Sequence, residues 1–324
     1  MSKLADATPE EVQLAMKRAK ESFGPFRTLS GRKRSSLLCR IAEKIKGSKE
    51  TLIQTAERET ALGEKRLGME LVRTVSEIER FADFARKEEW RNRQFESADP
   101  LRQPLPKPNM VTQRIPIGPV VVIGACNFPF AISVVGTDTI SALAVGCPVI
   151  VKSHPEHAQT CQSIADIVKE AIEENNSPEY CFQLVHGQDH LVTRSLVQDP
   201  NASCIAFTGS LVGGQALSKL VAERPSPIPF HAEMGSLNAV FALPRAIGAD
   251  VRKLARNYLN AVNLFAGQMC TKPGAFILME DSSTPAFLDE ISEEIRRQRV
   301  LPLLNHSVYP VSYTHLTLPT NGCV

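Results

Sequence analysis

Several short segments contain side chains capable of chemistry, and most of them stand just after apolar runs. They offer an amide, a cation, a glycine-rich turn, a carboxylate and a thiol. The segments are 124–129 with Asn127, Lys152 itself, 208–214, 233–235 with Glu233, and 267–273 with Cys270. Amides and the N–H groups of turns can hold anions, a carboxylate can move protons, and a thiolate can attack a carbonyl carbon. One reaction could use all of these groups if the fold brings them together.

The elements that must position these groups are expected between residues 120 and 243. Apolar runs predict strands at 120–123, 148–151, 182–185, 204–207 and 240–243. A helix is expected between 152 and 181, because Ile164, Val168 and Ile172 share one face of a helical repeat. Continuous apolar strands that alternate with amphipathic helices predict a parallel sheet covered on both faces, which is a doubly wound α/β domain. Such a sheet binds ligands at the carboxyl ends of its strands.

Residues 8–97 are predicted to be mostly helical. Thr8 and Glu11 form the capping box of a first helix, which Gly24 and Pro25 should end. Later helices are expected over residues 31–47, up to position 63, and from 76 to 90. Residues 98–118 differ, because prolines stand at 100, 104, 106, 108 and 116. This extended segment is predicted to be a crossing connection or an edge hairpin and not a central strand.

The composition is that of an ordinary globular chain. Of its 324 residues, 43% are hydrophobic and 22% are charged, and 37 basic residues nearly balance 35 acidic ones. This balance favours neither nucleic acid nor an anionic membrane as a partner, and the length predicts two domains. The apolar stretch 117–151 is interrupted by Asn127, Pro129 and Asp138. We therefore expect two buried strands flanking a helix there, and no membrane span.

Cysteine usage indicates a reducing compartment. The eight cysteines show neither CxxC nor zinc-like spacing, and no secretory signal opens the chain, so we expect a cytoplasmic protein without a metal site. His154 and His157 are interpreted as parts of a solvated loop. After Arg299 the chain contains no Asp, Glu, Lys or Arg, and residues 311–316 resemble a translated sequencing adapter. Residues 311–324 are therefore predicted to be a non-native tail.

Together these motifs resemble those of the aldehyde dehydrogenase superfamily. They occur in the same order along the chain as in that family, and at similar spacing. They are Asn127-Phe128-Pro129, Val151-Lys152, Phe207-Thr208-Gly209-Ser210, Glu233-Met234-Gly235-Ser236 and Gly267-Gln268-Met269-Cys270-Thr271. The residues in these motifs are most similar to those of the branch that oxidises ketoglutaric semialdehyde (2,5-dioxopentanoate). That branch also contains NADP-linked fatty-aldehyde enzymes. The resemblance implies a Rossmann-like, doubly wound cofactor domain and an incomplete α/β catalytic domain.

The resemblance also implies catalytic roles for three residues. Cys270 would be the nucleophile that adds to the aldehyde, and its alternative is a buried structural cysteine. Asn127, with the backbone N–H of Cys270, would hold the oxyanion, and its alternative is a cap of the loop before Pro129. Glu233, at the end of a buried strand, would activate the water that opens the thioester. Its alternative is an ion-paired glutamate at a sheet edge.

The implied cofactor is NADP or NAD. The turn that follows the strand at 204–207 would present N–H groups and a helix dipole to the diphosphate, although a plain strand-to-helix turn has a similar sequence. Its residues are Thr208, Gly209, Ser210 and Gly213. Lys152 would reach the adenosine ribose. NAD-preferring relatives often carry a glutamate three residues after this lysine, where Pro155 stands here with Glu156 next to it. The loss of the carboxylate at that position removes a group that would repel a 2′-phosphate, so NADP is an expected cofactor.

The resemblance further implies how the chain is organised. The NAD(P)-binding domain would occupy residues 1–236, with the 98–118 segment in an oligomerisation hairpin, and a partial catalytic domain would occupy residues 237–310. The implied partners are a small aldehyde and, in the full-length enzyme, further copies of the chain, but neither nucleic acid nor a membrane. Because family members are considerably longer, we expect this chain to be truncated at its C-terminus and to be inactive or insoluble alone.

Other functions stay open at this point. A thiol esterase would need no nicotinamide, so NADP reduction coupled to aldehyde oxidation distinguishes it from a dehydrogenase. A CoA-dependent acylating relative would commonly lack the base, so Glu233 weighs against it. A purely structural protein or inactive fragment would have no use for Cys270, Glu233 and Asn127 together.

Overall fold

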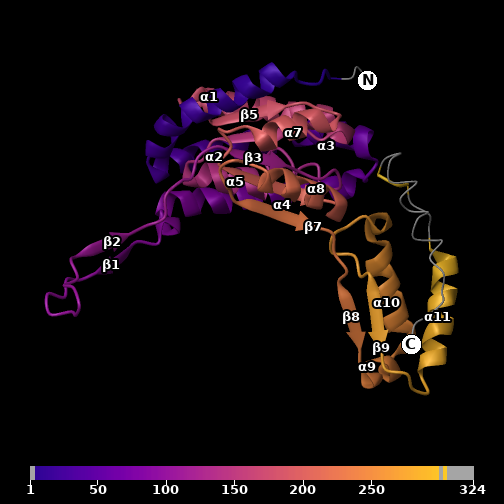
Figure 1. The fold of residues 1–324 in the computed structure, drawn as a ribbon. Coiled ribbons are helices and arrows are strands. Elements are labelled where there is room, and N and C mark those ends of the chain that lie inside the picture. The colour runs from indigo at the N-terminus through magenta and orange to yellow at the C-terminus, as the bar shows by residue number, and fades with distance from the viewer. Residues whose placement is uncertain (1–3, 299–301, 305–324) are drawn as a thin grey trace. The chain divides into compact units, whose positions relative to one another are not determined.

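A computed structural model of the protein describes residues 4–298 and 302–304. The chain divides into two compact units (Figure 1). The first comprises Met1–Glu59 and Gly63–Glu233, and the second comprises Thr60–Leu62 and Met234–Val324. The tail predicted at residues 311–324 lies outside the described residues.

Long helices occupy the N-terminal part of the chain. They are α1 (Pro9–Thr28), α2 (Gly31–Gly47), α3 (Lys49–Thr60) and α4 (Glu64–Lys87). The capping box of α1 is confirmed, since Glu11 N donates to Thr8 Oγ1 at 3.2 Å and Thr8 N donates to Glu11 Oε2 at 2.8 Å. The predicted end of α1 at Pro25 is wrong, because the helix continues to Thr28. Phe26 is fully buried, and its packing holds the last turn although Pro25 contributes no N–H.

A parallel β-sheet forms the core of the first unit. Its strands are β3 (Val120–Ile123), β4 (Val149–Lys152), β5 (Phe182–Val185), β6 (Cys204–Gly209) and β7 (Phe230–Met234). They lie in the order β5-β4-β3-β6-β7, so the first strand along the chain is the middle one. Val122 of β3 stands opposite Val151 of β4 and Ala206 of β6. The predicted doubly wound fold is confirmed, and its strand order reverses between β3 and β6.

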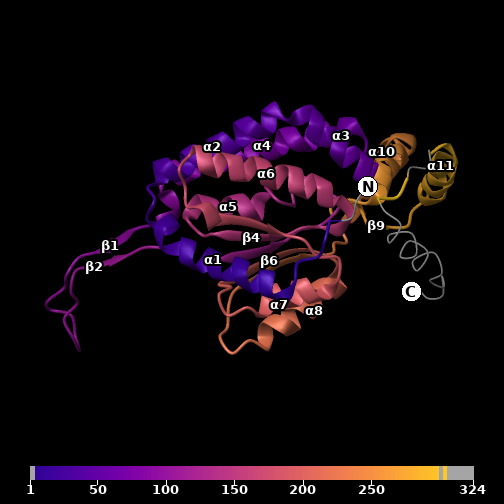
Figure 2. The ribbon, with the colours of Figure 1, turned by 90° about the horizontal axis from the view of Figure 1, so that it is seen from above.

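Helices cover both faces of this sheet (Figure 2). On one face α5 (Thr137–Val145) and α6 (Ala158–Glu174) lie with α2, α3 and α4. On the other face α7 (His190–Gln198) and α8 (Leu211–Ala222) lie with α1. The apolar stretch at 117–151 forms β3, α5 and β4, as predicted. In the described part of the chain, no helix is long and apolar enough to cross a membrane.

The second unit has a small sheet of its own. Its strands β8 (Ala239–Ala242) and β9 (Ala275–Leu278) pair in parallel. Its helices are α9 (Pro244–Ala249), α10 (Val251–Asn263) and α11 (Thr284–Arg297). Phe287 is buried in the core of this unit and stacks on Phe276 with ring centroids 4.9 Å apart.

Two strands differ from the sequence prediction. The run at 240–243 does form a strand, β8, but it pairs in the second unit and not in the large sheet. The strand that completes the large sheet is β7, where half-buried and exposed residues alternate. No continuous apolar run marks β7, because His231 and Glu233 occupy its exposed positions.

An exposed hairpin precedes β3. Its strands β1 (Gln94–Glu96) and β2 (Met110–Thr112) pair antiparallel, and a further bridge joins Asp99 to Lys107. The prediction that residues 98–118 do not form a central strand is confirmed. Apolar side chains on the hairpin are open to solvent, with Phe95 77% and Leu101 85% exposed.

Candidate active site

Asn127 lies in the loop between β3 and α5, and α4 fixes the backbone of that loop. Arg66 Nη2 of α4 donates to the carbonyl oxygen of Asn127 itself. Glu70, one turn further along α4, accepts hydrogen bonds from Phe130 N at 2.7 Å and Ala131 N at 2.8 Å. The loop that carries the predicted oxyanion ligand is therefore anchored on both sides of Phe128 and Pro129.

Arg66 and Glu70 also form a buried ion pair with each other. Their side chains are only 4% and 3% exposed. Burial raises the pKa of the Glu70 carboxyl, while Arg66 and the two loop N–H groups oppose that shift. Removing one partner of such a pair typically costs about 3–5 kcal/mol, because the other charge is left buried and unpaired. The sequence analysis missed both residues, although two charges four residues apart on the apolar face of a helix were a visible signal.

Lys152 ends β4, the strand next to β3. It is half-buried, and burial lowers its pKa. Among the described residues, no carboxylate oxygen lies within 4.0 Å of the Lys152 ammonium nitrogen, the distance that defines an ion pair. The chain then turns through a short 3-10 helix, η2 (Pro155–His157), in which Pro155 is exposed. A half-buried cation that forms no ion pair with a described residue suits a site for hydroxyl or phosphate oxygens.

His154 and His157 are not parts of a solvated loop, and that interpretation is wrong. Their rings stack with centroids 5.3 Å apart, and His157 is fully buried. His157 Nδ1 lies 3.2 Å from the Sγ of Cys161 on α6. Burial opposes the thiolate form, but His157 and the hydrogen bonds around Cys161 lower the pKa of this thiol to about 7. In the described part of the chain, no group of three or more His, Cys, Asp or Glu residues could hold a metal ion.

The burial of His154 makes stability depend on pH. Burial, together with His157 and Lys152, lowers the pKa of His154 to about 3. The unfolded chain takes up this proton at about pH 6.5, so the native state loses stability as the pH falls below that value. Between about pH 7.5 and about pH 5.5 this histidine alone should lower the free energy of unfolding by about 1.4 kcal/mol.

The variant His154→Asn tests this prediction. His154 Nδ1 accepts a hydrogen bond from Glu156 N at 3.2 Å, and an asparagine oxygen can accept the same bond without titrating. In urea unfolding at the two pH values, the variant should lose about 1.4 kcal/mol less than the wild type. Since His157 is present in both proteins, the comparison isolates His154. An identical pH dependence in both proteins would contradict the prediction.

The turn between β6 and α8 is built for a close approach of backbone to a ligand. Ser210 caps α8, and its Oγ accepts a hydrogen bond from Gly213 N at 3.1 Å. A Cβ on Gly209 would lie 2.5 Å from Cζ of Phe207, so this position requires glycine unless the ring moves. Leu211 and Val212 of the first helical turn are exposed. The first turn of α8 thus lies at the surface, where an anion could approach the helix N-terminus.

Glu233 lies on β7, but the expectation that this strand is buried is wrong. β7 ends the strand order of the large sheet, and Glu233 is exposed. Asp138, in the first turn of α5, lies close enough for electrostatic interaction with β7. Burial raises the pKa of Asp138, His231 opposes this shift, and Glu233 adds to it. The sequence analysis did not foresee Asp138 and His231 beside the candidate base.

Cys270 lies in the second unit, in a turn before β9. Its side chain is exposed. Lys272 N donates to Met269 O at 3.1 Å and closes the turn around Cys270. The Cys270 carbonyl oxygen accepts hydrogen bonds from Ser236 Oγ and, at 2.6 Å, from Asn238 Nδ2. Side chains that follow Glu233 in the sequence therefore hold the backbone of the thiol residue, and the sequence analysis missed both.

The backbone before this turn is strained. Phe265, Ala266 and Gly267 have φ values of 51°, 58° and 69°, all in the left-handed region. For a residue with a side chain this conformation costs roughly 1–2 kcal/mol. Strain of this kind accumulates at functional sites, where the surrounding structure must hold it.

The large sheet brings most of the predicted residues to one edge. Asn127 follows β3, Lys152 ends β4, Thr208 lies near the end of β6, and Glu233 lies near the end of β7. Because β3 lies between β4 and β6, the carboxyl ends of these parallel strands meet at the switch point. Cys270 belongs to the second unit and is not part of this arrangement.

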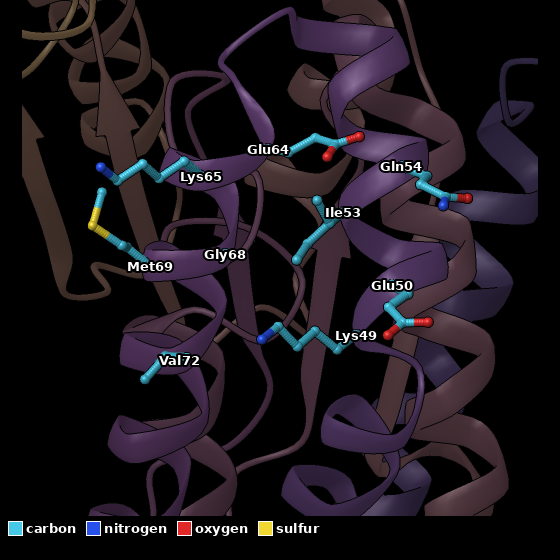
Figure 3. A pocket seen from close by; sticks show the side chains of 9 residues that line it. All are labelled: Lys49, Glu50, Ile53, Gln54, Glu64, Lys65, Gly68, Met69 and Val72. Atoms are coloured by element: carbon cyan, nitrogen blue, oxygen red, sulfur yellow. The ribbon is translucent and has the colours of Figure 1, made fainter.

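A separate hollow of about 650 Å³ opens between α3 and α4 (Figure 3). Ile53, Met69 and Val72 contribute its apolar surface, and charged residues that include Lys49 and Glu64 surround them. None of the predicted site residues lines this hollow. It therefore plays no part in the chemistry considered for the strand ends.

Comparison with known sequences identifies a family. The model of the aldehyde dehydrogenase family matches residues 1–309. Alpha-ketoglutaric semialdehyde dehydrogenase 2 of Azospirillum brasilense is 36% identical over 281 residues, and the alpha-ketoglutaric semialdehyde dehydrogenase of Acinetobacter baylyi is 35% identical over 292 residues. These matches cover 87% and 90% of this chain but 54% and 55% of the two relatives. The chain thus spans about half the length of the curated relatives that it matches.

Solved structures share the fold. A glyceraldehyde-3-phosphate dehydrogenase of Methanocaldococcus jannaschii, solved in complex with NADP, superposes with a TM-score of 0.78 at 22% identity and covers 91% of this chain and 60% of its own. An NAD-dependent benzaldehyde dehydrogenase of Corynebacterium glutamicum gives a TM-score of 0.78 at 21% identity, covering 96% of this chain and 66% of its own. At this identity the likeness concerns the fold alone.

Proposed function

The chain belongs to the aldehyde dehydrogenase family, and we propose that the whole protein oxidises an aldehyde to a carboxylic acid with NADP or NAD. The observation that carries this proposal is the switch point of the large sheet. There the Asn127 loop and the N-terminus of α8 follow neighbouring strands, β3 and β6. An oxyanion ligand and a diphosphate site at one sheet edge suit a reaction that transfers a hydride from a carbonyl adduct to a dinucleotide.

In the proposed reaction, the Cys270 thiolate forms a C–S bond to the aldehyde carbon, and the carbonyl oxygen takes up the negative charge. The side-chain amide of Asn127 and the backbone N–H of Cys270 donate hydrogen bonds to this oxyanion. NADP or NAD, held at the start of α8 and by Lys152, would supply the acceptor for the aldehyde hydrogen as a hydride, and the adduct on Cys270 would thereby become a thioester. Glu233 takes a proton from water, whose oxygen attacks the thioester; the C–S bond breaks and the carboxylic acid is released.

Residues of the first unit fit the cofactor. The N–H groups at the start of α8 would face the diphosphate, and the half-buried Lys152 would bind the adenosine ribose. The residues concerned are Thr208 and Gly209 at the end of β6, the cap residue Ser210, and Gly213 in the first turn of α8. Exposed Pro155 offers no carboxylate that would repel a 2′-phosphate, so we propose NADP as the preferred cofactor. On this assignment the first unit is the cofactor domain and the second unit is part of the catalytic domain.

The proposed substrate is ketoglutaric semialdehyde (2,5-dioxopentanoate), which would be oxidised to 2-oxoglutarate. Relatives at 36% and 35% identity that are named for this substrate support the assignment. Longer aliphatic aldehydes are the alternative, since the motifs also resemble NADP-linked fatty-aldehyde enzymes. We further propose that the whole protein is a homo-oligomer in which another copy covers the exposed apolar side chains of the β1–β2 hairpin, such as Phe95 and Leu101.

Reduction of the nicotinamide tests the proposed activity. The whole protein is mixed with NADP or NAD and with 2,5-dioxopentanoate, a long-chain aldehyde, or a thioester without any aldehyde. We expect reduced cofactor and carboxylic acid in equal amounts, most rapidly from 2,5-dioxopentanoate with NADP. Hydrolysis of the thioester at a comparable rate, without any reduction of cofactor by aldehydes, would assign a thiol esterase instead.

A further inference from the structure

The buried pair on α4 holds the Asn127 loop at two points. Arg66 donates to the Asn127 carbonyl oxygen, and its guanidinium lies 4.7 Å from the centre of the Phe128 ring. Glu70 accepts hydrogen bonds from the backbone N–H groups of Phe130 and Ala131. One ion pair therefore sets the backbone at the predicted oxyanion ligand and again three and four residues later.

Stability alone is a weak reason for this arrangement. Replacing a buried ion pair by apolar side chains of similar volume is often neutral or stabilising, because the desolvation of two charges offsets their attraction. Here each partner also makes hydrogen bonds to the backbone of one loop. Oxyanion ligands must be held within about 0.5 Å of their working position, and fixed contacts to the loop backbone serve that purpose.

We propose that Arg66 and Glu70 are positioning residues, which fix the loop so that the Asn127 amide meets the oxyanion formed at Cys270. This role rests on the proposed function, since it matters only if Asn127 stabilises charge during the reaction. Neither residue touches the substrate. Their loss should therefore lower kcat and leave KM nearly unchanged, because the interaction affected is one that strengthens in the transition state.

A cycle of variants of the whole protein tests the proposal. The double variant Arg66→Met/Glu70→Gln removes both charges together and keeps an amide oxygen at position 70. Its kcat for aldehyde oxidation should fall about 10- to 100-fold, with KM changed by less than about threefold. Asn127→Ala should lower kcat by about 100- to 1000-fold. Adding the double substitution to Asn127→Ala should lower kcat no further, because the pair acts through Asn127.

Hydrogen exchange reports on the loop independently of turnover. In the double variant the amides of Phe130 and Ala131 should exchange faster, while those of the central strand β3 stay protected. The matched control is the exposed pair Asp83–Arg86 on the same helix, changed to Asp83→Asn/Arg86→Met. This control should alter neither kcat nor the exchange of the two loop amides.

The outcomes separate the two proposals. If Asn127→Ala keeps wild-type turnover, the catalytic role of Asn127 itself fails. If Asn127→Ala loses turnover but the double variant keeps kcat within about twofold, the positioning role is overturned. Should the double variant not fold, Glu70→Asp takes its place, since it keeps the charge pair but shortens the reach to Phe130 and Ala131. We then expect kcat to fall several-fold, and an unchanged kcat would equally overturn the positioning role.

Discussion

Replacing Cys270 by serine should lower kcat for aldehyde oxidation in the whole protein by at least ~10³-fold. A serine hydroxyl stays protonated at neutral pH and is a much poorer nucleophile than a thiolate. Ser236 and Asn238 donate their hydrogen bonds to the backbone carbonyl oxygen of Cys270, and the variant keeps this oxygen. The rate of formation of reduced NADP with saturating aldehyde measures the effect.

The matched control is Cys39→Ser. Among the described cysteines, Cys39 and Cys270 are the exposed ones, and Cys39 lies on α2, far from Cys270 in the sequence. Cys39→Ser should leave kcat unchanged. Turnover of Cys270→Ser close to that of the wild type would refute the role of Cys270 as nucleophile.

Replacing Glu233 by glutamine should slow the release of product and spare the first chemical steps. Because hydride transfer precedes hydrolysis, each active site should form one reduced NADP in a rapid burst and then turn over about 10²- to 10³-fold more slowly than the wild type. The exposed position of Glu233 on β7 gives glutamine room to replace it without a packing change. Rapid mixing with aldehyde and NADP measures the burst and the steady rate in one trace.

Glu223→Gln is the control for this variant. Glu223 is an exposed glutamate at the end of α8, in the same unit as Glu233. It should behave as the wild type does. A slow steady rate of Glu233→Gln without any burst would place the defect before hydride transfer, and Glu233 would then not be the hydrolytic base.

The strands predicted at 120–123 and 182–185 match β3 and β5 to the residue. Every residue of β3 is apolar and buried, and in β5 only the half-buried Gln183 interrupts the apolar side chains, so both sequences mark the ends of their strands. β7, like β5, stands at an end of the strand order, but it could not be found in this way, because its exposed positions carry the polar residues His231 and Glu233. The run at 240–243 illustrates a second limit. An apolar run indicates a strand but not its partner, and β8 pairs with β9, thirty-six residues along the chain.

In the candidate site, too, the sequence predicted some of the residues and not others. Motifs placed Asn127, Lys152 and Thr208 after strands because residue types at strand ends are recognisable locally. The residues that hold those motifs were not recognised, since Arg66 and Glu70 on α4 contact a loop about sixty residues away. Helix α1 is a further example. Pro25 does not end this helix, which continues to Thr28 with Phe26 buried. Local patterns reveal reactive groups, whereas tertiary packing decides what supports them.

On the proposed mechanism, aldehyde oxidation passes through a covalent bond to Cys270. The most direct measurement is mass spectrometry of the whole protein with Glu233→Gln, quenched in acid after mixing with NADP and 2,5-dioxopentanoate, and then digested. We predict one acyl group for each active site, on the peptide that contains Cys270 and on no other cysteine peptide. Reduced NADP formed without any acylated Cys270, or an acyl group on a different cysteine, would contradict the account.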